Sequence, residues 1–267
     1  MAEYSGRVSG MPQGFDRNEY NINGVRTVVY SAGQGRPVVY WHGAGTFSGI
    51  DFAREWTKRF KVILPFHPGY GESADSPAIG CINDMLLHYL DLFHKLKLTQ
   101  FDLVGISLGG WMAAEFAVAH GHMLRKLVLV APAGLSVPEH PFPDLSTIPP
   151  GDIFSHLVND LNSIRAYLPE GGANPAELAA TMMRETQATA RIASTGPVNP
   201  RLEYWLHRAT MPTLLIWPKL DRLIPVGQTT KWMKFLPNAK LEIIENAGHL
   251  VLNESKKARQ AVVDFLG

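Results

Sequence analysis

The segment Gly105-Ile106-Ser107-Leu108-Gly109 joins an apolar run, Phe101 to Val104, to a helical pattern that extends from Leu108 to His120. A serine on a sharp turn between a strand and a helix projects its side chain above the carboxyl end of the sheet. Such a turn brings strand and helix so close that side chains would collide, which accounts for glycine at positions 105 and 109. Ser107 also begins the helix, where the dipole favours developing negative charge. The segment therefore predicts an exposed nucleophile on an α/β sheet.

The rest of the chain repeats this alternation of short apolar runs and longer amphipathic ones. Five further runs have the composition of buried strands: Pro37–Trp41, Lys61–Leu64, Lys126–Val130, Thr213–Trp217 and Lys240–Ile244. Helical spacing also occurs at Ile50–Arg59, Ile82–Leu96, Val226–Phe235 and Ser255–Leu266. Strands that are apolar on both faces and separated by helices indicate a mostly parallel sheet with helices on both faces. Asn23-Gly24, between two alternating runs, predicts a β-hairpin before this sheet.

Composition narrows the classes of protein to consider. The chain has 267 residues, 46% hydrophobic and 18% charged, a length that one large α/β domain can occupy. Its 25 Lys and Arg balance 24 Asp and Glu, and no basic run suggests a nucleic-acid partner. The single Cys81 excludes an intramolecular disulfide. Without a visible secretory signal or a run of about 18 apolar residues, we expect no membrane span, a cytoplasmic protein and a small-molecule substrate. The sequence leaves open whether the chain forms a homo-oligomer.

The alternation breaks between about residues 133 and 209. Prolines punctuate the start of this stretch, and helical segments follow with no strand between them. Asn174-Pro175-Ala176-Glu177 is a good helix start, because Asn caps, Pro fits the first turn and Glu favours the positive end. Asn199-Pro200 predicts a further helix in the same manner. We therefore expect a core domain formed by residues 1–132 and 210–267, with a helical cap inserted at 133–209.

A serine hydroxyl is a weak nucleophile, so it needs a base that a third group orients. His249 follows the apolar run Leu241 to Ile244, and Asp221 lies just beyond Thr213 to Trp217. Both residues fall on loops at the carboxyl ends of predicted strands, the edge on which Ser107 should project. We predict that Ser107, Asp221 and His249 meet there as catalytic residues.

A loop rich in small residues, His42-Gly43-Ala44-Gly45, follows the predicted strand Pro37–Trp41. Small residues let backbone N–H groups approach a reacting oxygen, and we assign an oxyanion hole to the amides of Ala44 and Leu108. Loss of one such donor typically adds about 3–4 kcal/mol to the barrier. His42 itself is expected to form hydrogen bonds within the loop and to border the substrate pocket.

Taken together, these segments resemble the α/β-hydrolase fold superfamily, and the resemblance covers nearly the whole chain. The matching segments are His42-Gly43-Ala44-Gly45, Pro68-Gly69-Tyr70-Gly71-Glu72-Ser73, Gly105 to Gly109, Asp221-Arg222-Leu223-Ile224-Pro225 and Gly248-His249. The resemblance implies that Ser107 is the nucleophile, His249 the general base and Asp221 its partner, with no metal or organic cofactor. Two positions depart from the family pattern: His67 replaces the usual aspartate, and Pro218 follows Trp217 where glycine is common.

Within the superfamily, the serine argues against members that use an aspartate nucleophile and leaves three hypotheses for an enzyme that uses the serine. The first is hydrolysis of a carboxylic ester or lactone. The second is hydrolysis of a carbon–carbon bond in vinylogous diketo acids, for which Arg165, Arg184 or Arg191 could bind the substrate carboxylate. Leu250 stands where that family usually has tryptophan, which disfavours the second hypothesis. The third is acyl transfer to an acceptor other than water, or a lyase reaction that uses the same three residues. The opposing class is a non-catalytic ligand-binding protein, which would not need a base for Ser107.

Apolar side chains in the predicted cap favour a small or medium, mostly apolar acyl substrate, because ligand pockets are mainly apolar. We assign His42, Phe142, Trp205 and Leu250 to the wall of that pocket.

Overall fold

The computed structural model describes residues 14–144, 147–149 and 152–267. Eight strands form one sheet in the order β1-β2-β4-β3-β5-β6-β7-β8. Their bounds are β1 Asp16–Ile22, β2 Val25–Ala32, β3 Pro37–Trp41, β4 Lys61–Pro65, β5 Phe101–Ile106, β6 Leu124–Val130, β7 Thr213–Pro218 and β8 Ala239–Ile244. The strands from β4 through β3 to β8 pair in parallel, and β1 and β2 complete the sheet as antiparallel strands. This is the α/β-hydrolase fold that the sequence predicted.

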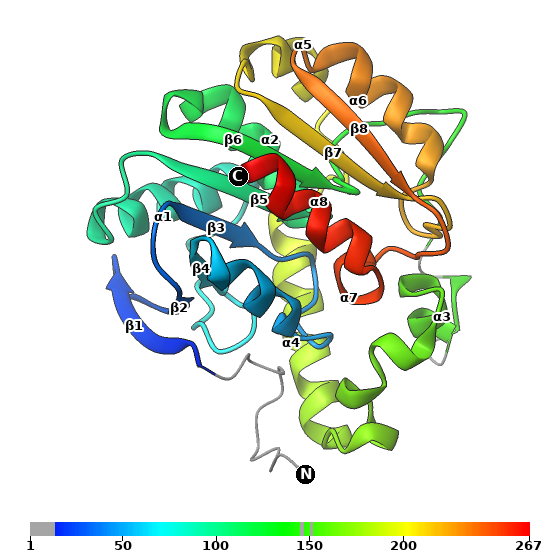
Figure 1. Cartoon of the computed structure of the whole chain (residues 1–267). Coiled ribbons are helices and arrows are strands. Elements are labelled where there is room, and N and C mark those ends of the chain that lie inside the picture. The colour runs from blue at the N-terminus through cyan, green and yellow to red at the C-terminus, as the bar shows by residue number, and fades with distance from the viewer. Residues whose placement is uncertain (1–13, 145–146, 150–151) are drawn as a thin grey trace.

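Helices connect the parallel strands and pack on both faces of the sheet (Figure 1). The α-helices are α1 Ile82–Lys95, α2 Leu108–His120, α3 Ile153–Leu157, α4 Pro175–Ile192, α5 Leu202–Trp205, α6 Thr229–Phe235, α7 Val251–Glu254 and α8 Lys256–Leu266. The 3-10 helices are η1 Asp51–Lys58, η2 Gly121–Met123, η5 Leu161–Ser163, η6 Arg165–Tyr167, η7 Pro169–Gly171, η8 Leu206–Arg208 and η9 Val226–Gln228. No described helix is long and apolar enough to cross a membrane.

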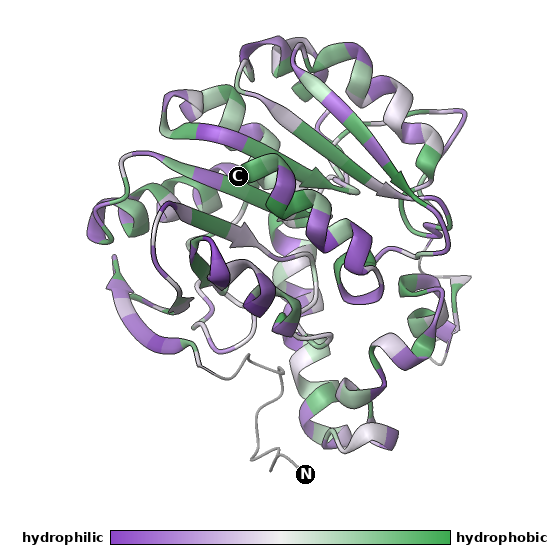
Figure 2. Ribbon diagram, viewed as in Figure 1, coloured by the Kyte–Doolittle hydropathy of each residue, from purple (hydrophilic) through white to green (hydrophobic). Residues whose placement is uncertain are grey.

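Alternate residues of the central strands enter two separate hydrophobic clusters, as the pleat of a strand requires. In β5, Leu103 packs with α1 and α2, whereas Val104 packs with η1 and α8. All six residues of β5 are buried, and so are all six of β7. Figure 2 shows apolar residues gathered on these central strands, whereas β1 at the edge is largely hydrophilic. Burial on both faces explains why the strands read as continuous apolar runs.

The predicted hairpin is confirmed, and one predicted strand differs in its burial. Asn23 and Gly24 take φ of 49° and 86° between antiparallel β1 and β2, as a tight hairpin turn requires. In β8, by contrast, only Ile244 is buried. β8 lies at the edge of the sheet and has a single neighbour, β7, so the expectation of a fully buried strand at Lys240–Ile244 was wrong.

The described residues between β6 and β7 contain no strand, and their helices take two different positions. The long helix α4 packs on the loops that follow β3 and β4. Its Glu185 accepts hydrogen bonds from Thr46 on the first loop and from Gly71 on the second. Asn174 caps α4 as the sequence predicted, accepting from two backbone N–H groups of the first turn. The later helix begins at Leu202, two residues beyond the predicted start. It packs into the core cluster beside α2 rather than over the sheet edge.

Candidate active site

Ser107 lies on a strained turn between β5 and α2. Its φ and ψ are 55° and −118°, a conformation that costs a non-glycine residue about 1–3 kcal/mol. Its backbone is held by three hydrogen bonds: its N–H donates to Val130 O at 3.0 Å, and its carbonyl accepts from Trp111 and Ala133 at 2.9 and 3.1 Å. These bonds stabilise a turn that presents the hydroxyl to the carboxyl edge of the sheet.

The flanking glycines are required by close backbone approach, which confirms the prediction made for them. A Cβ atom on Gly105 would lie 2.4 Å from the carbonyl oxygen of Gly109. One on Gly109 would lie 2.3 Å from the carbonyl oxygens of Trp41 and His42, at the end of β3. Gly109 therefore also lets α2 approach the loop that carries Ala44.

His249 and Asp221 meet as the sequence predicted. His249 Nδ1 lies 2.8 Å from Asp221 Oδ2, and both side chains are buried. Asp221 Oδ1 accepts from the backbone N–H groups of Leu223 and Ile224 at 2.9 and 2.8 Å. Since a carboxylate at this position accepts, Nδ1 of His249 carries the proton and Nε2 is left as a base. Both residues lie on loops that follow strands, Asp221 after β7 and His249 after β8.

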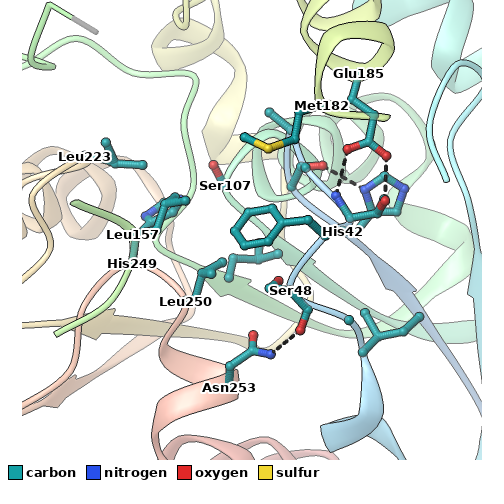
Figure 3. Close-up of a pocket in the computed structure, with 18 of the residues that line it drawn as sticks. His42, Ser48, Ser107, Leu157, Met182, Glu185, Leu223, His249, Leu250 and Asn253 are labelled. Atoms are coloured by element: carbon teal, nitrogen blue, oxygen red, sulfur yellow. Dashed lines mark hydrogen bonds between the residues drawn. The ribbon is translucent and has the colours of Figure 1, made fainter. Parts of the chain in front are cut away.

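Ser107 and His249 line one cavity of about 240 Å³, drawn in Figure 3. No hydrogen bond joins the two side chains anywhere in the described structure. Catalytic hydrogen bonds are often long in unliganded proteins and tighten when substrate binds. Apart from these two, the lining consists of Tyr40, His42, Gly43, Ala44, Gly45, Thr46, Phe47, Ser48, Gly49, Ile50, Phe66, Ile106, Ile153, Leu157, Met182, Glu185, Thr186, Leu223, Leu250 and Asn253.

The two amides assigned to the oxyanion hole flank this serine. Leu108 is the first residue of α2, so its N–H has no acceptor within the helix. Ala44 lines the cavity, and its N–H donates to no acceptor in the part of the chain that the structure describes. The neighbouring Gly43 leaves little space, because a Cβ atom there would lie 3.2 Å from Ser107 Cβ. Neither amide thus has an acceptor among the described residues, and their assignment to an oxyanion hole remains a prediction.

His42 and His67 form a neutral, buried pair beneath the cavity. His42 Nδ1 donates to Gly43 O at 2.7 Å, and its Nε2 accepts from His67 N–H at 3.1 Å. His67 Nε2 donates to His42 O at 2.9 Å, and its Nδ1 accepts from the hydroxyl of Tyr89. Burial lowers the pKa of His42 to about 4 and that of His67 well below its usual value. His42 borders the cavity, whereas His67 lies behind it as part of the loop structure.

Two of the four residues assigned to the pocket wall lie elsewhere. Leu250 lines the cavity beside His249, as does His42. Phe142 packs instead against the core cluster, because the loop after β6 folds towards η9, where Gln228 Nε2 donates to His140 O at 3.0 Å. Trp205 is 48% exposed on α5, the helix that packs beside α2. The expectation that Phe142 and Trp205 border this cavity was therefore wrong.

The arginines proposed to bind a substrate carboxylate do not line the cavity either. Arg184 donates to Gly71 O at 2.7 Å, Arg191 pairs with Asp75, and Arg165 is exposed. Neither lysine nor arginine occurs among the described residues of the lining. The acidic side chain of the lining is Glu185. Burial raises its pKa above the usual value, and hydrogen bonds from Thr46 and Gly71 offset part of that rise.

Glu185 is a site residue that the sequence analysis missed, although the sequence carries a signal for it. The buried residues of α4 are Leu178, Thr181, Glu185, Ala188 and Ile192. Their spacing of three and four residues marks one helix face. A glutamate in that stripe is anomalous, because buried carboxylates need partners. No cluster of three or more metal-ligating side chains occurs in the described ranges.

Comparison with known sequences gives a family match over most of the chain. Residues 38–265 match the family described as "Alpha/beta hydrolase family". This chain belongs to the alpha/beta hydrolase family. The match spans the serine turn, the His249–Asp221 pair and the residues that line the cavity.

Several curated relatives are named as hydrolases of dienoic acids and related compounds. The chain is 28% identical over 254 residues to 2-hydroxy-6-oxo-6-(2'-aminophenyl)hexa-2,4-dienoic acid hydrolase of Metapseudomonas resinovorans. The aligned region covers 88% of this chain and 84% of that protein. It is also 28% identical over 266 residues to 2-hydroxymuconate semialdehyde hydrolase of Pseudomonas putida, covering 91% of each. These names support an enzyme of the hydrolase class, and they match the carbon–carbon hypothesis better than the ester hypothesis.

Among solved structures, a membrane phospholipase A described as a bacterial virulence factor superimposes with a TM-score of 0.81. The alignment covers 95% of this chain and 86% of that one at 22% identity. At that identity the likeness supports the alpha/beta hydrolase fold.

Proposed function

We propose that the protein is a serine hydrolase that cleaves an uncharged carboxylic ester or lactone with a small, mostly apolar acyl group. The observation that carries this proposal is the cavity at Ser107: its described lining is largely apolar, holds Glu185 and contains no cationic side chain. Its volume of about 240 Å³ lies below the roughly 300–1,000 Å³ of pockets that hold drug-sized ligands, which suits a short acyl chain.

In the proposed reaction, His249 Nε2 takes the proton of Ser107 as Oγ attacks the substrate carbonyl carbon. The Ala44 and Leu108 amides donate to the resulting oxyanion. Donors that already point at the site of developing charge usually make the largest single contribution to lowering the barrier. His249 then returns the proton to the departing alcohol, which leaves an acyl group on Ser107. Water, deprotonated by His249, attacks this acyl-enzyme and releases the acid. Asp221 holds the imidazole in the required tautomer throughout.

The second candidate is hydrolysis of a carbon–carbon bond in a dienoate, which the names of the curated relatives favour. The same serine, histidine and aspartate would serve, with an enolate in place of the alcohol as leaving group. The substrates in several of those names are carboxylic acids, so this chemistry brings an anion into the cavity. The nearby arginines Arg184 and Arg191 are engaged with Gly71 and Asp75 instead.

One experiment separates the two candidates. Purified protein is assayed in parallel with p-nitrophenyl butyrate and with 2-hydroxy-6-oxo-6-phenylhexa-2,4-dienoate, a coloured ring-fission product. The proposal predicts a kcat/KM for the ester at least about 100-fold above that for the dienoate, a difference of about 2.7 kcal/mol in barrier. The opposite order would replace the ester assignment by carbon–carbon hydrolysis. If neither substrate is turned over and a fluorophosphonate probe does not label Ser107, a binding protein is favoured.

A further inference from the structure

Glu185 connects the inserted helix α4 to the loop that carries Ala44. Its side chain is buried, and both carboxylate oxygens are engaged. Oε2 accepts from the backbone N–H of Thr46 at 3.0 Å, while Oε1 accepts from Thr46 Oγ1 at 2.5 Å and from Gly71 N–H at 2.9 Å. Figure 3 shows Glu185 projecting from α4, with dashed lines marking hydrogen bonds of its carboxylate. Three donors from two core loops thus meet one carboxylate of the cap segment.

The segment between His42 and Thr46 has few other anchors. Gly43 O accepts from His42 Nδ1 at one end, and Thr46 bonds to Glu185 at the other. Between them, the backbone groups of Ala44 and Gly45 form no hydrogen bonds within the described structure. Ala44 is also exposed, so packing alone does not fix its N–H. The direction of that N–H therefore depends on the two ends of the segment.

We propose that Glu185 is a positioning residue that sets the Ala44 amide against the oxyanion, so that stabilisation of the transition state depends on the cap helix. This inference rests on the proposed function, in which the Ala44 amide binds the oxyanion. Its physical basis is that catalytic geometry tolerates little error: a 1 Å misplacement costs about 100-fold in rate. Replacing one carboxylate oxygen by an NH2 group also leaves at least one Thr46 donor facing a second donor, which favours a shift of the loop.

The test compares Glu185→Gln and Thr46→Val with wild type in hydrolysis of p-nitrophenyl butyrate. A matched control is Asp75→Asn, which breaks the ion pair of Asp75 with Arg191 on the same helix without touching the Ala44 loop. We expect kcat to fall about 10–100-fold in Glu185→Gln and less in Thr46→Val, with KM little changed. Asp75→Asn should retain wild-type kcat, and Thr46→Ser, which keeps the hydroxyl, should lose less kcat than Thr46→Val.

Two inhibitors distinguish positioning from a merely structural role. A trifluoromethyl ketone forms a covalent adduct on the serine and places an oxyanion in the hole, whereas the matching methyl ketone binds only as a ground-state analogue. In Glu185→Gln, the Ki of the trifluoromethyl ketone should rise by the factor by which kcat/KM falls, and that of the methyl ketone should stay constant. Equal weakening of both ketones, with KM raised and kcat unchanged, would overturn the proposal.

Failure of the inference is distinguishable from failure of the proposed function. Absence of ester turnover in the wild type, or turnover retained in Ser107→Ala, would refute the function itself. An active wild type whose kcat survives Glu185→Gln would refute only the role of Glu185. If Glu185→Gln does not fold, Thr46→Val decides, because it deletes one hydroxyl and leaves the buried carboxylate in place. Wild-type kcat and trifluoromethyl ketone Ki in Thr46→Val would then reject the proposal.

Discussion

His249 Nδ1 donates a hydrogen bond to Asp221 Oδ2 over 2.8 Å, and both side chains are almost inaccessible to solvent. The other oxygen of Asp221 accepts from two backbone amides of its own loop, at Leu223 and Ile224. The loop thus fixes the carboxylate, the carboxylate fixes the imidazole, and His249 lines the same cavity as Ser107.

This relationship predicts the effect of Asp221→Asn. The asparagine oxygen can still accept from Leu223 and Ile224, so its NH2 group would face His249 Nδ1. That group donates, so it favours the tautomer with the proton on Nε2, which cannot accept from Ser107. We expect kcat to fall about 10⁴-fold with the thermal midpoint nearly unchanged, measured by steady-state kinetics and calorimetry. Activity within tenfold of wild type would show that Asp221 does not set the tautomer.

The backbone strain at Ser107 predicts that two inactive variants differ in stability. Ser107→Ala and Ser107→Gly both lack the nucleophile, so each should lose at least about 10³-fold in kcat. Only glycine tolerates a φ of 55° with a ψ of −118° without steric cost, although it also raises the entropy of the unfolded chain. We expect Ser107→Gly to exceed Ser107→Ala by about 1 kcal/mol in unfolding free energy, measured by urea denaturation. Equal stabilities would mean that the turn stores no strain.

The buried histidines predict how stability depends on pH. Burial lowers the pKa of His42 from 6.5 to about 4, so in this window the unfolded chain binds a proton that the folded chain does not. The contribution of neutral His42 is fully present above about pH 6.5 and is lost as the pH falls to about 4, amounting to about 3 kcal/mol. His67 acts in the same direction.

Urea denaturation between pH 4 and pH 8 measures this dependence. Replacing His42 by Asn should flatten it, whereas replacing the exposed His94 by Gln should leave it unchanged. A slope that is the same in all three proteins would contradict the assignment of a neutral, buried His42.

The charge of the cavity predicts a preference among esters of equal length. p-Nitrophenyl butyrate and p-nitrophenyl hemisuccinate differ chiefly by a terminal carboxylate, which would enter a lining that holds Glu185 and no described cation. Each kcat/KM is divided by the rate constant for hydrolysis of the same ester by hydroxide, which corrects for intrinsic reactivity. We then expect a value at least tenfold higher for the neutral ester, a difference of about 1.4 kcal/mol in barrier. A preference for the anionic ester would show that a cation reaches the cavity and would strengthen the dienoate alternative.

The sequence allowed the sheet and the serine turn to be predicted because both depend on local patterns. β3 has the predicted bounds, as does α2, and the glycines at 105 and 109 lie where backbones meet. Asp221 and His249 could be placed because the carboxyl ends of parallel strands share an edge. These inferences needed no knowledge of how distant side chains pack.

The cavity wall could not be predicted in the same way. Phe142 and Trp205 were chosen for their apolar side chains within the insertion, but the path of a loop without regular structure depends on tertiary contacts such as that of Gln228 with His140. The division at residues 132 and 210 also remains a prediction, since the end of the insertion packs into the core cluster. Glu185 was overlooked because its significance depends on loops more than 100 residues away.

The measurement that tests the central claim most directly is covalent labelling with a fluorophosphonate probe, followed by intact-protein and peptide mass spectrometry. A serine activated by His249 should take up one equivalent of probe, mapped to Ser107, and the labelling rate should fall at least about 100-fold in His249→Ala. Ser107→Ala should remain unmodified. Failure of the folded wild type to react, or an adduct on another residue, would contradict the assignment of Ser107 as the nucleophile.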